Sequence, residues 1–172
     1  MQSSHLCVLS KPNMTAASLA DIRKELQHTH ADTLQALCLR LARYKKENKE
    51  LLNYLLFEAH DEPGYIQQVK TEVELMFDEI SDKNLYLVKK ILRRILRFTN
   101  RQIKYSGLPQ TELELRIFFC ERIVAARIPL STGTVLYNLY QQQLKKIGSV
   151  LTKLPEDLQG DYTTSLKTIR YE

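Results

Sequence analysis

Apolar residues recur at every third or fourth position through most of the chain, whereas proline and glycine fall mainly in a few short clumps. A repeat near 3.6 residues is typical of amphipathic helices that turn one face to a core. The clumps are typical of turns between such helices. The pattern therefore predicts an all-α fold of seven to eight antiparallel helices joined by short turns.

The expected helices lie between these clumps. Their approximate ranges are 15–28, 31–59, 63–80, 81–105, 109–127, 131–154 and 155–169. The range 31–59 contains no proline or glycine, and its leucines fall on one stripe, which permits a single long helix. Its polar run 45–50 favours a break instead, with Asn48 as a cap, so we expect two helices there. Ser81 or Asp82 is expected to cap the helix that ends near Tyr105.

The helix expected from Thr111 to Arg127 differs from the others in its distribution of apolar residues. These residues cover more than half of its circumference: Leu113, Leu115, Ile117, Phe119, Cys120, Ile123 and Val124. A helix that is apolar over so wide an arc normally lies at the centre of a domain. We therefore expect this helix to be the most buried one of the fold.

The chain has 172 residues, a length that fits one domain. We expect a flexible leader over residues 1–13 and a single all-helical domain over residues 14–172. Two arrangements are compatible with short joints between helices: a superhelical stack of antiparallel helix pairs and a globular helical bundle. We favour the superhelical stack because helix follows helix without a long crossover.

Two segments carry a resemblance to known proteins. Residues 41–52 read LARYKKENKELL, and residues 89–97 read KKILRRILR. Together they resemble a family of uncharacterised, all-helical bacterial proteins over most of the chain after residue 14. That resemblance implies a helical fold and no particular activity. The two Lys-Lys pairs that begin at Lys45 and Lys89 have a spacing close to that of helical-pair repeats, and the rhythm of helix pairs resembles HEAT-type repeats without a repeated consensus.

The cysteines indicate a cellular compartment. Cys7, Cys38 and Cys120 are odd in number and far apart, so no pair has the spacing of a metal or redox motif. We expect them to be free thiols, which suit a reducing cytosol. No apolar run reaches the ~20 residues that a membrane-spanning helix needs. We therefore expect a cytoplasmic protein.

Motifs for catalysis or metal binding are absent or incomplete. The chain contains no GxSxG, P-loop or GxGxxG sequence. Glu25 and His28 have the ExxH spacing of di-iron bundles, but such a site also needs a second ExxH, which the chain lacks. Cys120 lies on the apolar arc of the expected central helix, where a buried structural thiol is the usual role. We therefore expect no cofactor, no metal and no enzymatic activity, with an enzyme whose site is assembled from scattered residues as one alternative.

The strongest functional signal is a run of basic residues between Leu85 and Gly107. The run contains no aspartate or glutamate, and its seven cations fall within an arc of about 140° on one helix face. Such a face can bind phosphates or an acidic protein, or lie on an anionic membrane. The alternative without a ligand is that acidic residues on neighbouring helices neutralise its charge within the fold. Tyr86 and Tyr105 flank this face and are candidates for stacking on bases. The candidate polyanion-binding residues are Lys89, Lys90, Arg93, Arg94, Arg97, Arg101 and Lys104.

The leading functional prediction is a non-enzymatic protein-interaction or scaffold module, with another protein as its partner. The alternative is a nucleic-acid or other polyanion binder that uses the basic helix of residues 85–105. The net charge of +5 favours acidic partners only weakly. If the basic face contacts a polyanion, at least three of its central arginines should be exposed and unpaired in the free protein. Those arginines are Arg93, Arg94, Arg97 and Arg101.

Overall fold

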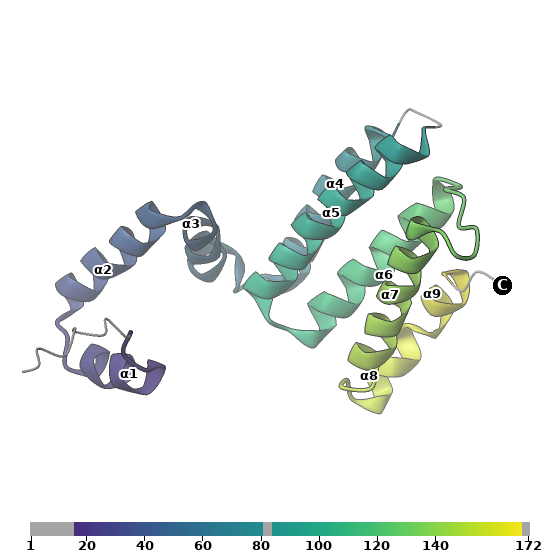
Figure 1. The fold of residues 1–172 in the computed structure, drawn as a ribbon. Helices are drawn as coiled ribbons and strands as arrows, with labels where there is room; N and C mark the ends of the chain where they lie inside the picture. Colours follow the sequence, from purple (N-terminus) through teal and green to yellow (C-terminus); the bar gives the residue numbers. More distant parts are fainter. Residues whose placement is uncertain (1–15, 81–83, 170–172) are drawn as a thin grey trace, which may run out of the picture. The chain divides into compact units, whose positions relative to one another are not determined.

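The computed structural model describes residues 16–80 and 84–169 (Figure 1). It is 80% helical, and no strand occurs in those ranges, which confirms the predicted all-α fold. The chain divides into two compact units, residues 1–48 and 49–172. The predicted leader over residues 1–13 lies outside the described residues. The helical elements are α1 (Leu19–Gln27), α2 (Ala31–Tyr44), α3 (Lys46–Asn53), the π-helical η1 (Tyr54–Glu58), α4 (Glu62–Asp78), α5 (Leu85–Ser106), α6 (Pro109–Ala125), α7 (Val135–Leu151), α8 (Glu156–Asp161) and α9 (Thr163–Thr168).

The first unit contains α1 and α2. Ser18 begins α1 with a capping box, in which the Asp21 amide donates to Ser18 Oγ at 3.2 Å and the Ser18 amide donates to Asp21 Oδ2 at 3.3 Å. These bonds satisfy amides that the helix leaves free, and they set a start later than the predicted residue 15. Neither α1 nor α2 has a buried residue, although each carries an apolar stripe.

The predicted break within residues 31–59 is confirmed. α2 ends at Tyr44, and Lys45 adopts an extended conformation with φ −140° and ψ 144°. Asn48 Nδ2 donates a hydrogen bond to the carbonyl oxygen of Leu41 at 2.9 Å. That carbonyl belongs to the last turn of α2, where the helix supplies no partner. Asn48 therefore caps the end of the helix before the break.

Side-chain caps begin α4 and α5 in the second unit. The Asp61 side chain caps α4, whose first turn contains Pro63 as predicted. The Asn84 side chain caps α5 by accepting a hydrogen bond from a backbone amide of its first turn. The predicted caps of α5, Ser81 and Asp82, lie outside the described residues. Because Asn84 is the observed cap, α5 begins a few residues later than predicted.

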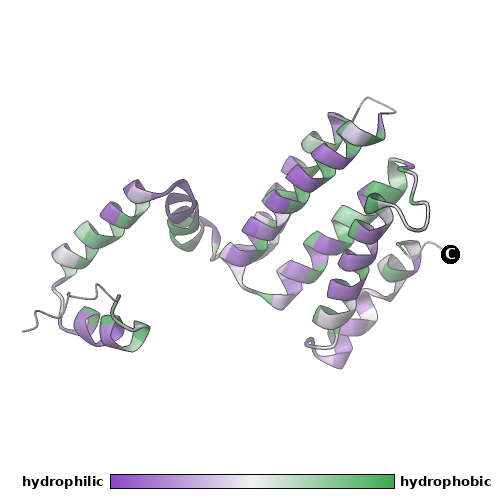
Figure 2. Ribbon diagram, in the orientation of Figure 1, coloured by the Kyte–Doolittle hydropathy of each residue, from purple (hydrophilic) through white to green (hydrophobic). Residues whose placement is uncertain are grey.

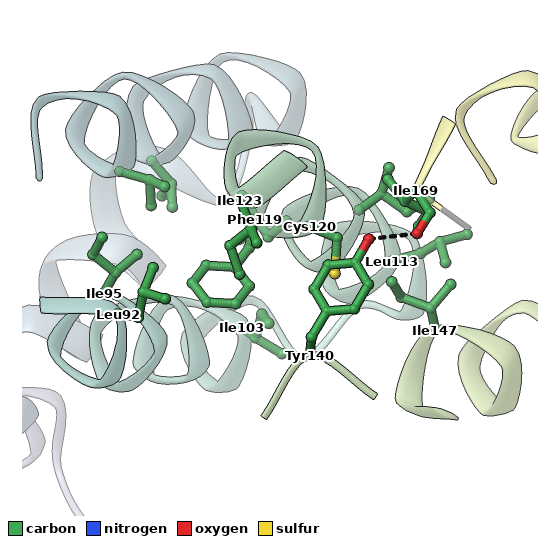
Figure 3. Packing of buried hydrophobic residues seen from close by; sticks show 14 of the residues in the cluster. Leu92, Ile95, Ile103, Leu113, Phe119, Cys120, Ile123, Tyr140, Ile147 and Ile169 are labelled. Carbon is green, nitrogen blue, oxygen red and sulfur yellow. Dashed lines mark hydrogen bonds between the residues drawn. The ribbon is translucent and has the colours of Figure 1, made fainter. Parts of the chain in front are cut away.

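The prediction of a single helix over residues 155–169 is wrong. The chain forms two short helices there, α8 and α9, which meet at Tyr162. Gly160 lies in the last turn of α8, and the low helix propensity of glycine favours an end at that position. The Tyr140 hydroxyl on α7 donates a hydrogen bond to the carbonyl oxygen of Ile169 (Figure 3). This bond fixes the chain after α9 against α7.

Helix α6 lies at the centre of the second unit. It packs against α4, α5, α7 and α9, and Figure 3 shows its Phe119 and Cys120 among side chains of neighbouring helices. Eight residues of α6 are buried, compared with six in α7 and five each in α4 and α5. The prediction that this helix is the most buried one is therefore confirmed. The buried residues of α6 are Thr111, Leu113, Leu115, Arg116, Ile117, Phe119, Cys120 and Ile123.

The superhelical stack is not confirmed. The helix pairs α4–α5 and α6–α7 pack on each other through α6, which contacts both α4 and α5. Contact of that kind occurs both in stacked pairs and in globular bundles. A superhelix needs at least three stacked repeats, and two pairs are too few to define one.

Candidate interaction surfaces

The basic face predicted for residues 85–105 lies on α5. The opposite face of α5 is buried in the core, and Figure 2 shows hydrophilic and hydrophobic positions alternating along this helix. Among the seven candidate cations, Lys89 and Arg101 are half-buried. The other candidate cations are exposed: Lys90, Arg93, Arg94, Arg97 and Lys104. The helix therefore presents most of its positive charge to solvent.

Two arginines of this face form ion pairs with other helices. Arg94 binds the carboxylate of Glu79, and Arg101 Nε lies 3.2 Å from Glu50 Oε2 of α3. Within the described residues, only Arg93 and Arg97 among the four central arginines are exposed and unpaired, so the condition predicted for polyanion contact, at least three such arginines, is not met. A polyanion site on this face therefore has to include its lysines. Among the seven candidate cations of α5, those that are exposed and have no carboxylate partner within the described part of the chain are Lys90, Arg93, Arg97 and Lys104.

Some of the acidic residues on the neighbouring helices pair with cations outside the basic face. Glu74 of α4 pairs with Arg122 at 3.1 Å, and Glu114 of α6 pairs with Lys70 at 2.9 Å. Glu79, directly after α4, does form an ion pair with the basic face, through Arg94. Neutralisation by neighbouring helices is therefore partial, and the basic face keeps a net positive charge.

The two tyrosines next to the basic face differ in exposure. Tyr86 is exposed, and Lys89 Nζ lies 5.3 Å from the centroid of its ring. Tyr105 is half-buried, and its hydroxyl donates to Glu50 Oε2 at 2.8 Å. Of these two candidates for base stacking, Tyr86 is therefore the one that presents its ring to solvent.

A second surface consists of apolar side chains at the start of the chain. None of the residues in α1, α2 or α3 is buried. Seven of the seventeen exposed large hydrophobic residues in the described ranges lie in the first unit. Figure 2 shows hydrophobic positions recurring along α1 and α2. In the first unit these residues are Leu19, Ile22, Leu26, Leu37, Leu39, Leu41 and Tyr44.

The carboxylate of Glu62 links several helical elements of the second unit. It accepts hydrogen bonds from the Tyr54 hydroxyl at 2.7 Å, from Ser106 Oγ at 2.5 Å and from Thr111 Oγ1. These donors lie on η1, α5 and α6, so the carboxylate joins three elements to α4. Burial and the hydrogen bond to Glu62 raise the pKa of Tyr54. Because every partner is a side chain of this chain, we assign the cluster a structural role.

Arg116 is a charged residue buried inside the second unit. Its Nε donates to Glu112 Oε1 at 2.8 Å, and one terminal nitrogen donates to Gln143 Oε1 at 2.7 Å and Asn100 Oδ1 at 3.1 Å. A buried charge with a carboxylate and two amide oxygens as partners is compensated. The network therefore links α5, α6 and α7 and leaves no reactive group.

The residues considered for catalysis or metal binding lie apart. Cys120 is fully buried, and burial raises the pKa of its thiol to about 12. Such a thiol stays protonated at neutral pH and is not an activated nucleophile. Glu25 and His28 lie at exposed positions in and just after α1. The described ranges contain no group of three or more His, Cys, Asp or Glu side chains that could hold a metal ion.

A small cavity lies between α7 and α9. Its volume is about 170 Å³, and no titratable side chain lines it. The lining residues are Leu144, Ile147, Gly148, Leu151, Leu166 and Ile169. The cavity therefore offers apolar contact and no group for acid–base or nucleophilic chemistry.

Each helix in the described ranges is too short or too polar to cross a bilayer. In comparisons with known proteins, the chain matches no family model, no curated protein and no solved structure. A functional proposal therefore depends on the two surfaces described above.

Proposed function

We propose that this protein is a non-enzymatic interaction module that holds another polypeptide on the apolar faces of α1 and α2. One observation carries the proposal: α1 and α2 have no buried residue, although each helix has an apolar stripe. Exposed apolar clusters of this kind are typical of sites for protein–protein contact.

Short helices gain most of their stability from packing. α1 has 9 residues and α2 has 14, and isolated helices shorter than ~12–15 residues are marginal in water. Leu37 is 40% exposed and Leu41 is 59% exposed. Covering such side chains contributes about 25 cal/mol per Å² of apolar surface removed from water. A partner that covers these stripes therefore stabilises the helices as it binds.

The spacing of the stripe on α2 indicates what kind of partner fits. Four positions follow the i, i+3, i+4, i+7 pattern: Leu34, Leu37, Cys38 and Leu41. An amphipathic helix enters an apolar groove through side chains at this spacing. Asp32 and Arg43 lie on the opposite side of the helix, which also carries the exposed Leu39. The proposed partner is therefore a protein with an apolar groove or an unpaired helix face.

A photocrosslinking residue tests the proposal in the full chain, expressed in its native cell. Benzoylphenylalanine is placed at Leu37 on the stripe or at Ala36 on the opposite side of α2. We expect one specific protein adduct from position 37, unchanged by nuclease treatment, and no such adduct from position 36. Equal crosslinking from both positions would contradict the proposal.

A matched pair of substitutions shows whether the stripe itself makes the contact. Leu41→Asp places a charge on the stripe and should abolish the adduct from position 37. Gln35→Asp adds the same charge away from the centre of the stripe and should retain the adduct. Both positions are exposed, so neither change should alter the thermal melt. Persistence of the adduct in Leu41→Asp would mean that the apolar stripe is not the binding surface.

A further inference from the structure

Four exposed cations of α5 form a row along the helix, called here the α5 row: Lys90, Arg93, Arg97 and Lys104. At 1.5 Å per residue the row is about 21 Å long, and at 100° per residue its side chains fall within an arc of about 60°. Within the described ranges, none of the four has a carboxylate partner. The α5 row therefore points four positive charges in one direction.

The α5 row is held in place before any ligand binds. On the opposite side of the helix, Leu92 is 1% exposed and Ile95 is 0% exposed, so the core fixes the position of α5. Arg94 and Arg101 are held beside the row by the carboxylates of other elements. These ion pairs also compensate two acidic groups that would otherwise repel an anion. A ligand of the row therefore requires little ordering of the helix on binding.

The surroundings of the row distinguish between classes of anionic partner. A helix that lies on a membrane inserts its apolar face into the bilayer, but the apolar face of α5 is buried in the core. A protein partner needs an interface centre that is poor in charge. Beyond Leu87, α5 has no exposed large hydrophobic residue among those described. Nucleic-acid interfaces are polar and strongly positive, which is the character of this face.

We propose that the α5 row binds the phosphate backbone of a nucleic acid, with each of its four cations on one phosphate. Arginine binds phosphate oxygens bidentately, and lysine adds a point charge. The length of the row equals the rise of about six base pairs of duplex DNA. Tyr86 falls on the same helix face at the start of the row, and its exposed ring is placed to stack on an unpaired base. This activity uses residues other than those of the apolar stripes of α1 and α2.

Four phosphate contacts set a definite salt dependence. Each contact adds about 0.9 to the log–log salt slope for duplex DNA and about 0.7 for a single strand. The expected slopes are therefore about 3.6 and about 2.8. Between about 50 and 200 mM salt, duplex affinity should fall about 150-fold and single-strand affinity about 50-fold.

The test is a fluorescence-anisotropy titration of the full chain at three salt concentrations within that interval. The probes are a labelled DNA duplex and a labelled single-stranded RNA of mixed sequence, each about 20 nucleotides long, which exceeds the length of the row. The test variant is Arg93→Glu/Arg97→Glu. The matched control is Lys145→Glu/Lys146→Glu, which makes the same change in net charge at two exposed positions of α7. Poly-L-glutamate and phosphatidylserine vesicles serve as competitors that represent an acidic protein and a membrane.

The α5 variant should lose about 1.8 of the duplex slope, so its affinity falls only about 12-fold over the same salt interval. The control should keep the wild-type slope, and both variants should melt like the wild type because the replaced side chains are exposed. If charge reversal alters the melt, Arg93→Gln/Arg97→Gln provides the same comparison without added repulsion. The proposal is overturned by undetectable binding at the lowest salt or by an equal loss of slope in the control. Tighter binding of poly-L-glutamate or of vesicles through the same arginines overturns it as well.

Discussion

Replacement of Phe119 by alanine tests the central position of α6. The Phe119 side chain is 0% exposed, and its ring centroid lies 5.9 Å from that of Phe77 with the planes tilted by 57°. Truncation of a fully buried phenylalanine costs about 3–5 kcal/mol, because transfer energy is lost and a cavity remains. A tilted aromatic pair contributes about 0.5–1.5 kcal/mol beyond its buried area. We therefore expect a loss in the upper part of the 3–5 kcal/mol range.

Phe57→Ala is the matched control, because it removes the same atoms from a side chain that is 62% exposed. It should change the free energy of unfolding by no more than about 0.5 kcal/mol. Urea unfolding can be followed by tyrosine fluorescence, since the chain has nine tyrosines and no tryptophan, and Tyr140 is buried. The urea midpoint should move while the m-value stays constant. A loss below about 1 kcal/mol for Phe119→Ala, or equal losses for both variants, would show that α6 is peripheral.

Two further changes test the groups inside the second unit. Glu62→Gln removes the charged acceptor of three hydroxyl groups and should lower the free energy of unfolding by about 1–3 kcal/mol. Glu72→Gln, at an exposed position of the same helix, is the control and should change it by no more than about 0.5 kcal/mol. The urea midpoints of the two variants measure the difference. In a Cys7→Ser chain, N-ethylmaleimide should label Cys38 rapidly and Cys120 only after denaturation, because burial keeps Cys120 protonated. Mass spectrometry of the intact chain measures both labels, and rapid double labelling of the folded protein would contradict the burial of α6.

Local patterns in the sequence predicted the helices and the central position of α6. The apolar arc of residues 111–127 is wide, and a wide arc has to be covered on several sides, so burial follows from the pattern itself. The break near residue 45 was predictable because a polar run interrupts the stripe. The split at Tyr162 was missed because Gly160 is a weak signal inside an otherwise helical segment. Helical periodicity shows that α2 has an apolar face, but it does not show whether the fold covers that face.

The basic face was predictable because it depends on local spacing, whereas its ion pairs were not because they depend on tertiary contacts. Seven cations at helical spacing within one segment share a face whatever the rest of the chain does. The partner of Arg101 is Glu50, which lies far away in the sequence, in the polar run that also marked a helix break. Only the tertiary fold, in which η1 directly after α3 contacts α5, brings these charges together. Local spacing thus located the surface, and tertiary contacts determined which of its cations remain available.

The two proposed surfaces differ in what binding has to change. The core already fixes α5, so a ligand of the α5 row gains mainly from released counterions, and its affinity depends steeply on salt. The helices α1 and α2 have no buried residue, so a partner on their stripes gains from apolar burial and also has to order short helices. Apolar burial gives a negative heat-capacity change and little dependence on salt. Each surface therefore has its own thermodynamic signature. A calorimetric titration repeated at several salt concentrations identifies which surface a given ligand occupies, before mutations have located its binding site.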